Sequence, residues 1–119
     1  MPAPGGQAKS HLWILVTDAC EGSAEAVIVS LTTLRLDRDQ TVILQRGDHP
    51  FITHQTAVLY SDARIVDVSH IDAMIHHGTA VAHEPCSGLT LELVQDGLLQ
   101  SPFTARKVIS FCKRAWRKA

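Results

Sequence analysis

The chain has 119 residues, of which 45% are hydrophobic and 19% charged, a composition typical of one globular domain and not of a disordered chain. The formal net charge is −1 with histidine neutral, which excludes a positive field over the whole surface as the means of attracting a polyanion. No apolar run reaches the roughly 18 residues that a membrane span requires, and the first six residues lack the order of a signal peptide. We therefore expect a cytoplasmic protein without a membrane partner.

Charged and titratable residues are unevenly distributed along the chain. Six of the eleven Lys and Arg residues fall within the last fourteen positions, so the C-terminus is basic and the rest of the chain acidic. Protonation of all seven histidines would take the formal charge from −1 to +6, so we expect the behaviour to change between about pH 5 and 7. The three cysteines lack a CxxC pair, which predicts reduced thiols and no disulfide framework.

The first half of the chain shows the pattern of short strands. Residues 1–10 contain Pro and Gly without periodicity and are predicted to be a disordered tail, followed by a single domain over 11–119. Continuous apolar runs indicate strands over 12–16 and 26–33 that are buried on both faces, the second with a hydroxyl-rich end at the rim of the sheet. Further strands are predicted over 41–44, 56–60 and 63–66, with a turn at Ser61-Asp62. Five short strands favour a small closed or nearly closed barrel over 11–68.

The second half of the chain, 69–119, is predicted to be helical, which makes the fold mainly β, of the α+β class, with two or three helices. Ser69 and Asp72 resemble a capping box, and Gly78 is expected to end that helix. Residues 89–98 fit either a helix or an alternating strand. Ser101 and Pro102 predict the start of the last helix. In that helix an apolar stripe is expected, made of Val108, Phe111, Cys112 and Ala115. The basic residues Lys107, Arg114 and Lys118 are expected on its other faces.

The loop between the third and fourth predicted strands concentrates polar chemistry. It reads Gly47-Asp48-His49-Pro50-Phe51-Ile52-Thr53-His54, with two histidines, an acid and a hydroxyl. Binding and catalytic residues occur disproportionately on loops, so this loop is the first candidate for a site. The alternative is a structural turn in which Asp48 bonds its own backbone and the histidines are merely exposed.

Three segments, His11–Val16, 26–33 and 56–67, resemble in order and local pattern the SH3-like barrel of the PemK/MazF/Kid family of bacterial toxins. The resemblance covers about residues 11–72, with Arg64 and Asp67 in register with family positions. The opening strand of the family is missing, His11 stands where the family usually has Arg, and Asp62 stands where Gln is common. The resemblance implies a metal-independent endoribonuclease acting on single-stranded RNA, an antitoxin as partner, and a homodimer.

Cleavage of RNA by internal attack requires a base for the 2'-hydroxyl, an acid for the departing 5'-oxygen and a cation for the phosphate. The resemblance and this chemistry together make His11, Thr32, His49 and Arg64 the catalytic candidates, without a cofactor. The candidates for binding the substrate are Thr33, Thr53, His54, Lys107 and Arg114. For Arg64 the alternative is a surface pair with Asp62 or Asp67, an interaction that contributes little.

A second hypothesis is a binding module that keeps the barrel but has lost catalysis. The departures from the family pattern and the additional C-terminal half favour it, and the basic terminal helix would then bind RNA, DNA or an acidic partner. The competing interpretation of that helix is a solvated helix end, where cations are favoured by the helix dipole.

A third hypothesis is a metal site. Six histidines could contribute ligands, although no HExxH or Cys-His spacing is present and the neighbouring pair His76-His77 is expected to point to different faces of a helix. The histidines concerned are His49, His54, His70, His76, His77 and His83.

Overall fold

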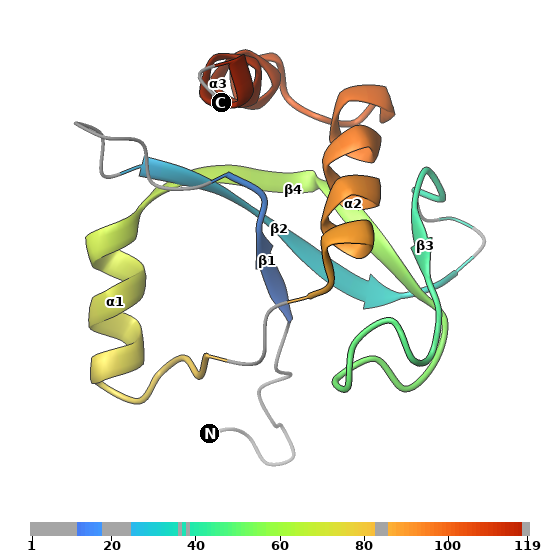
Figure 1. The fold of residues 1–119 in the computed structure, drawn as a ribbon, viewed down its shortest axis with the longest axis horizontal. Coiled ribbons are helices and arrows are strands. Elements are labelled where there is room, and N and C mark those ends of the chain that lie inside the picture. The colour runs from blue at the N-terminus through green and yellow to red at the C-terminus, as the bar shows by residue number, and fades with distance from the viewer. Residues whose placement is uncertain (1–11, 18–24, 36, 38, 83–85, 118–119) are drawn as a thin grey trace.

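The computed structural model describes residues 12–17, 25–35, 37, 39–82 and 86–117. A four-stranded antiparallel sheet with the order β1-β2-β4-β3 is combined with three helices (Figure 1). The elements are β1 (Trp13–Leu15), β2 (Glu25–Thr33), β3 (Ile43–Leu44), β4 (Thr56–Asp67), α1 (Val68–His76), α2 (Gly88–Gln100) and α3 (Arg106–Arg117). The predicted tail, 1–10, and His11 lie outside the described residues.

The predicted α+β class with two or three helices is confirmed. Among the described residues the helices contain 34 residues and the strands 26, because β1 and β3 are only three and two residues long. Over the described residues the sheet is open, with β1 and β3 at its two edges and no pairing between them. The expected closed barrel is therefore not found in this part of the chain. None of the described helices is both long and apolar enough to cross a membrane.

The sheet is built around the pair of long strands β2 and β4. They pair from Glu25 with Asp67 to Thr33 with Thr56, and the register shifts between Ile28 and Ser30. At this shift Val29 of β2 stands opposite residues 60–63 of β4, so β4 bulges there. The turn predicted at Ser61-Asp62 falls on this bulge, and the segments predicted as two strands are one strand that bends.

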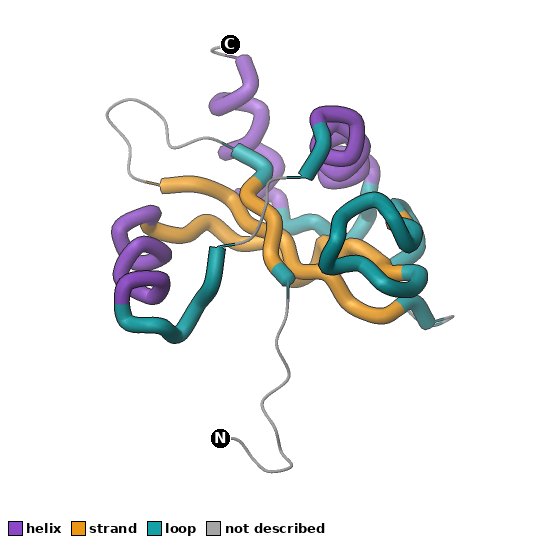
Figure 2. The backbone as a smooth tube through the Cα atoms, turned by 60° about the horizontal axis from the view of Figure 1, so that its bottom comes forward, coloured by secondary structure: helices purple, strands orange, loops and turns teal. Residues whose placement is uncertain are grey.

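One face of the sheet is covered by α2 and α3, which lie on the same side of it in Figure 2. Alternate residues of β2 point to this face, as the period of a strand requires, and they pack with apolar residues of both helices. The buried cluster includes Val27, Val29, Leu31, Val58, Tyr60, Val94, Leu98, Val108 and Cys112. The apolar stripe predicted for the last helix is confirmed, since Val108 and Cys112 are fully buried.

Strand β1 differs from the expectation of a strand buried on both faces. It pairs only with β2, Trp13 is half-buried, and the side chain of Leu15 is 46% exposed. An edge strand of three residues has only one neighbouring strand, so its side chains are less enclosed than those of a central strand. The expectation for β2 holds better, because every residue from Ala26 to Leu31 is buried or half-buried and Thr33 is exposed at the rim.

The helix starts differ from the predicted ones. Asp67, and not Ser69, caps α1: its carboxylate accepts from the backbone N–H of Ser69 at 3.0 Å and from its hydroxyl at 2.7 Å. Those two donors lower the pKa of Asp67. Gly78, with φ of 81°, follows the end of α1 as predicted. The segment 89–98 is helical and is capped by the hydroxyl of Ser87.

Ser101 does not start the last helix, which begins at Arg106. Its hydroxyl instead donates to Asp39 Oδ2 at 2.6 Å and accepts from the Phe103 N–H at 3.1 Å. Asp39 Oδ1 accepts from the hydroxyl and the backbone N–H of Thr41 at 2.6 and 2.9 Å. The carboxylate of Asp39 thus joins the loop between β2 and β3 to the loop between α2 and α3.

Gly97 allows α2 to approach the sheet. The hydroxyl of Tyr60, a fully buried residue of β4, donates to the carbonyl of Val94 at 2.8 Å. A Cβ atom at Gly97 would collide with Tyr60 Oη and with Val42 Cγ2. The absence of a side chain at this position is therefore required by the contact between helix and sheet.

We expect Gly97→Ala to lower the free energy of unfolding by about 1–3 kcal/mol, as overpacking of a core does. This loss occurs although alanine is intrinsically the better helix former by about 1 kcal/mol. Gly88→Ala in the first turn of the same helix is the matched control, because an added Cβ there meets no atom within 4 Å. Chemical denaturation measures both variants. Equal stability of the two would contradict the close approach.

Asp39→Asn should destabilise the protein at neutral pH. Burial, the largest influence, raises the pKa of Asp39, but the hydrogen bonds from Ser101 and Thr41 together outweigh it and leave the pKa below its ordinary value. A carboxyl with a lowered folded pKa contributes stability above its unfolded pKa and loses that contribution as the pH falls through the folded value. The difference in unfolding free energy between parent and variant should therefore shrink below about pH 4. A difference that stays constant down to pH 2 would exclude this role.

Candidate nucleic-acid interface

The loop after β3 folds as a turn held by its own polar groups. Gly47 has a φ of 102°, a conformation that favours glycine. Asp48 Oδ2 accepts from the backbone N–H of Gln45 at 2.7 Å, and the Asp48 N–H donates to the Gln45 carbonyl at 3.0 Å. The Ile52 N–H donates to the His49 carbonyl at 2.9 Å, and Ile52 is part of the core. Asp48 therefore has the backbone-bonding role of the alternative interpretation.

His49 is directed into the protein and not toward solvent. Only 8% of it is exposed, and its Nδ1 accepts from the Phe51 N–H at 3.0 Å. Because Nδ1 is used as an acceptor for the backbone of the loop, the imidazole stabilises the turn. A group that takes a proton from a substrate must be reachable by it, and His49 is not placed in that way.

Three of the residues predicted to bind substrate meet at the end of the sheet where β2 ends and β4 begins. His54 Nε2 lies 3.0 Å from the hydroxyl oxygen of Thr33, and His54 Nδ1 lies 3.3 Å from that of Thr53. All three residues are exposed. In the tautomer protonated at Nδ1, the ring donates to Thr53 and accepts at Nε2 from the Thr33 hydroxyl. In this tautomer the lone pair of His54 Nε2 is used by the Thr33 hydroxyl, so a substrate hydroxyl would have to displace Thr33 to reach it.

Thr32 and Arg64 share one face of the sheet but do not meet. Thr32 is paired with Ala57, whereas Arg64 is paired with Ile28, four residues from Thr32 along β2. At the rise of a strand these positions are about 13 Å apart. The structure therefore does not bring Thr32, His49 and Arg64 to one phosphate. His11, the fourth catalytic candidate, lies outside the described residues.

Arg64 lies against neighbours on its own face of the sheet. Its guanidinium carbon is 5.1 Å from the centroid of the Trp13 ring. Its Nη2 lies 3.4 Å from Asp62 Oδ1, and the two side chains are 56% and 42% exposed. An exposed pair of this kind contributes little to stability.

Lys107 and Arg114 belong to a cationic face of α3, formed by Arg106, Lys107, Lys113 and Arg114. These four side chains are all exposed, and the sequence of α3 contains no acid. At 100° per residue they fall within an arc of about 120°, centred near the exposed Ser110. The arc lies opposite the buried Val108. Lys118, also predicted on the polar side, is outside the described residues.

Other chemistry suggested by the sequence finds no support in the described residues. Burial raises the pKa of the Cys112 thiol to about 12, so this cysteine is not a nucleophile. Within the same residues no three His, Cys, Asp or Glu side chains are grouped to hold a metal ion. The ring centroids of the neighbouring His76 and His77 are 5.5 Å apart in an edge-on contact. His83 lies outside the described part.

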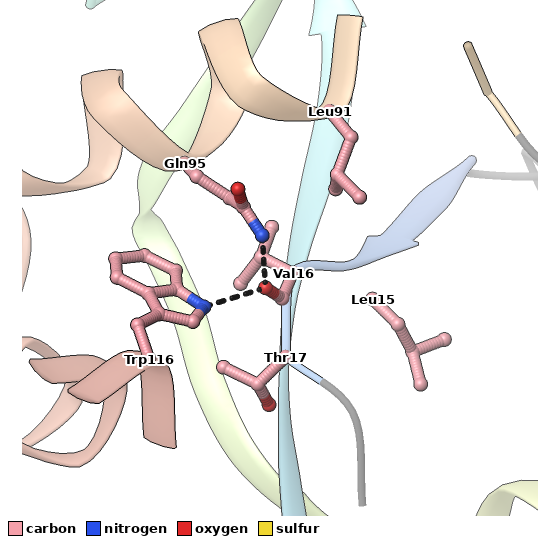
Figure 3. A pocket seen from close by; sticks show the side chains of 6 residues that line it. All are labelled: Leu15, Val16, Thr17, Leu91, Gln95 and Trp116. Carbon is pink, nitrogen blue, oxygen red and sulfur yellow. Dashed lines mark hydrogen bonds between the residues drawn. The ribbon is translucent and has the colours of Figure 1, made fainter. Parts of the chain in front are cut away.

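A small cavity of about 100 Å³ lies between the end of β1 and the two covering helices (Figure 3). Its two polar side chains from the helices are directed to one acceptor: Gln95 Nε2 and Trp116 Nε1 donate to the Val16 carbonyl at 2.9 and 3.1 Å. Their donors are used to attach α2 and α3 to β1. The arrangement is structural.

Sequence reasoning passed over two residues near Arg64. Trp13 was treated only as part of an apolar strand, and Ser30 was not singled out at all. Asp62 was assigned to a turn and also named as a surface partner of Arg64, and that pairing is found. Their shared face follows from the register, with Trp13 opposite Ser30, and that register could be obtained only with the strand pairing known. The one available signal was Trp13 itself, a large aromatic residue in a chain with only 5% aromatics.

Fold and surface together define a small α+β protein with a cationic terminal helix and a separate polar cluster at one end of its sheet. Comparisons of the chain with family models, with curated proteins and with solved structures found no match.

Proposed function

We propose that the protein binds single-stranded RNA through the cationic face of α3. The observation that carries this proposal is the separation of the helix into a buried apolar stripe and an exposed arc of four cations without an acid. Phosphate contacts by Lys and Arg supply most of the affinity of non-specific nucleic-acid binding. A near-neutral protein can bind a polyanion in this way if its positive charge is concentrated on one surface.

The acidic character of the rest of the chain also favours α3 as the surface that binds a polyanion. Residues 1–105 contain all twelve acids and only five of the eleven cations. The neighbouring α2 carries two exposed acids, Glu92 and Asp96, and no Lys or Arg. Repulsion by the acidic part and attraction by α3 therefore favour one orientation of a bound strand.

The helix dipole accounts for Arg114 in the last turn of α3, but not for the two cations at the start of the helix. Cations stabilise the last turn of a helix and are unfavourable in the first turn, where the dipole is positive. Arg106 and Lys107 stand in the first turn of α3, which has no acid. Their placement costs the helix stability, so a partner of opposite charge accounts for it better than capping does.

Arg114 adds a feature suited to single strands. Its guanidinium carbon lies 6.0 Å from the centroid of the Phe111 ring, and the arginine is exposed. A guanidinium supported by an aromatic ring offers a flat surface for a base and donors for a phosphate. Ser110, between the cations, offers a hydroxyl for the same backbone.

Lys107→Gln combined with Arg114→Gln should weaken binding of a labelled single-stranded RNA and reduce its salt dependence. Loss of two phosphate contacts should make the slope of log K against log salt shallower by about 1.4, since each contact contributes about 0.7 for single strands. Fluorescence anisotropy at several salt concentrations measures both quantities.

The matched control is Arg35→Gln with Arg46→Gln. Both residues are exposed, both lie outside α3, and the change in net charge is the same. Affinity that falls equally in the two double variants would show a diffuse charge effect and contradict a site on α3. Binding by the parent that is unaffected by salt would contradict the phosphate-based mode altogether.

A second proposal is the metal-independent RNA cleavage implied by the PemK/MazF resemblance, together with its SH3-like barrel, antitoxin partner and homodimer. The contact of Thr33 with His54, itself in reach of Thr53, is what supports it. The 2'-hydroxyl would displace the Thr33 hydroxyl from His54 Nε2, which would accept its proton, and a water molecule would protonate the departing 5'-oxygen. Arg64, toward the other end of β4, is too distant to bind the same phosphate, so this proposal is centred on His54 and Thr33.

If this second proposal holds, single-stranded RNA should be cleaved in the presence of a chelator, and His54→Gln should reduce the rate by about 10² or more, the contribution typical of a general base. His70→Gln on α1, another exposed histidine, is the control and should cleave at the parental rate. Gel analysis of the 3' ends identifies the cyclic phosphate expected from internal attack. Absence of cleavage by the parent would remove the proposal and leave the binding function unaffected.

A further inference from the structure

The face of the sheet opposite α2 and α3 carries an aromatic ring and charged side chains in one cluster. Trp13 is paired with Ser30, and Ile28 is paired both with Leu15 of β1 and with Arg64 of β4. Directly paired residues point to the same face of a sheet. Trp13 and Arg64 thus lie on one face from strands on either side of β2, although 51 positions separate them in the sequence.

The two flat groups of this cluster are in contact and partly open to solvent. The Arg64 guanidinium lies 5.1 Å from the centroid of the Trp13 ring. Trp13 is half-buried, the side chain of Arg64 is 56% exposed, and the adjacent Leu15 is 46% exposed. Aromatic rings and guanidinium planes on an exposed sheet are the groups on which unpaired bases stack.

Asp62 gives the cluster a hydrogen-bond acceptor at a defined position. Its Oδ2 accepts from the hydroxyl of Ser30 at 3.2 Å, and Ser30 is only 2% exposed. Its Oδ1 lies 3.4 Å from Arg64 Nη2, and its side chain is 42% exposed. A carboxylate has about four acceptor positions, so two described contacts leave capacity for donors from a ligand.

The cluster differs from α3 in its net charge, and we therefore expect it to bind a different kind of chemical group. Arg64 is paired with Asp62, so the two side chains together carry no net charge and offer a phosphate no net attraction. A flat ligand with N–H donors at its edge fits better, because the ring and guanidinium can stack on it and the carboxylate can accept from it. A nucleobase has both properties.

We propose that Trp13, Arg64 and Asp62 form a binding site for an unpaired guanine base. This inference rests on the proposed RNA-binding function and deepens it by assigning a base-reading site distinct from the phosphate-binding helix. Guanine presents two adjacent donors, N1–H and the 2-amino group, which match the two oxygens of a carboxylate. Uracil presents one N–H between two carbonyl oxygens, which Asp62 would repel.

The test uses the nucleoside guanosine, which has no phosphate and so does not depend on α3. In heteronuclear NMR, the indole N–H of Trp13, identified by its loss in Trp13→Phe, should shift in a saturable manner on addition of guanosine. The indole of Trp116, which donates to Val16 on the covered side of the sheet, is the internal reference and should not shift. Uridine and 1-methylguanosine should bind at least about tenfold more weakly, as expected for loss of a specific donor pair. Equal shifts with all three nucleosides would overturn the assignment to guanine.

Two variants of equal charge change complete the test. Asp62→Asn should reduce the affinity for guanosine about tenfold or more and leave the weak uridine response unchanged. Asp72→Asn, an exposed acid of α1, should bind guanosine like the parent. Guanosine affinity unchanged in Asp62→Asn would refute the site even if Trp13 variants failed to fold.

The failure of this inference can be told apart from the failure of the proposed function. The double variant Lys107→Gln with Arg114→Gln should lose RNA affinity and keep its guanosine response. RNA binding that depends on α3 without any guanosine response refutes the base site alone. A guanosine response with RNA binding that is indifferent to the α3 variant refutes the phosphate-binding role of α3.

Discussion

The pairing of β2 with β4 is the constraint on which the rest of the structure depends. These two strands run together from Glu25–Asp67 to Thr33–Thr56, and both short strands attach to them as edges. Their register decides which side chains enter the core and which share the outer face. The bulge at residues 60–63 changes that register once, and within it Tyr60 is directed to α2 and Asp62 to Ser30 on the other side. One irregularity therefore serves both the core and the proposed base site.

The proposed binding surfaces follow from two different ways of placing charge. On α3 four cations stand together without an acid, and this unbalanced charge suits a polyanion. Beside Trp13 the charge of Arg64 is balanced by Asp62, and what remains is flat surface and hydrogen-bonding capacity. The first arrangement provides affinity that depends on salt, and the second provides selectivity among bases. The His54 cluster, at the far end of the sheet, is the part that would have to act if RNA is also cleaved.

Much of the fold could be predicted from local patterns. The amphipathic last helix, the end of α1 near Gly78 and the hydroxyl-rich end of β2 are encoded by neighbouring residues, and these predictions hold. The predictions that failed required distant partners. Ser101 and Pro102 have the local signature of a helix start, but the Ser101 hydroxyl is bound to Asp39, 62 residues earlier. Ser61-Asp62 has the signature of a turn, but β4 pairs with β2 on both sides of it, and the chain bulges there without reversing.

The sequence by itself determined the α+β class, a C-terminal half with two or three helices and the basic character of the last one, because hydrophobic periodicity and charge spacing act within one segment. It also placed Thr33, Thr53 and His54 among the candidate residues, and the structure brings these three together. Only the tertiary structure decided that the sheet is open over the described residues, that His49 is buried, and that Trp13 meets Arg64. Each of these depends on which strands pair and in which register. A shift of one residue would reverse the faces, and no local pattern in the chain specifies that choice.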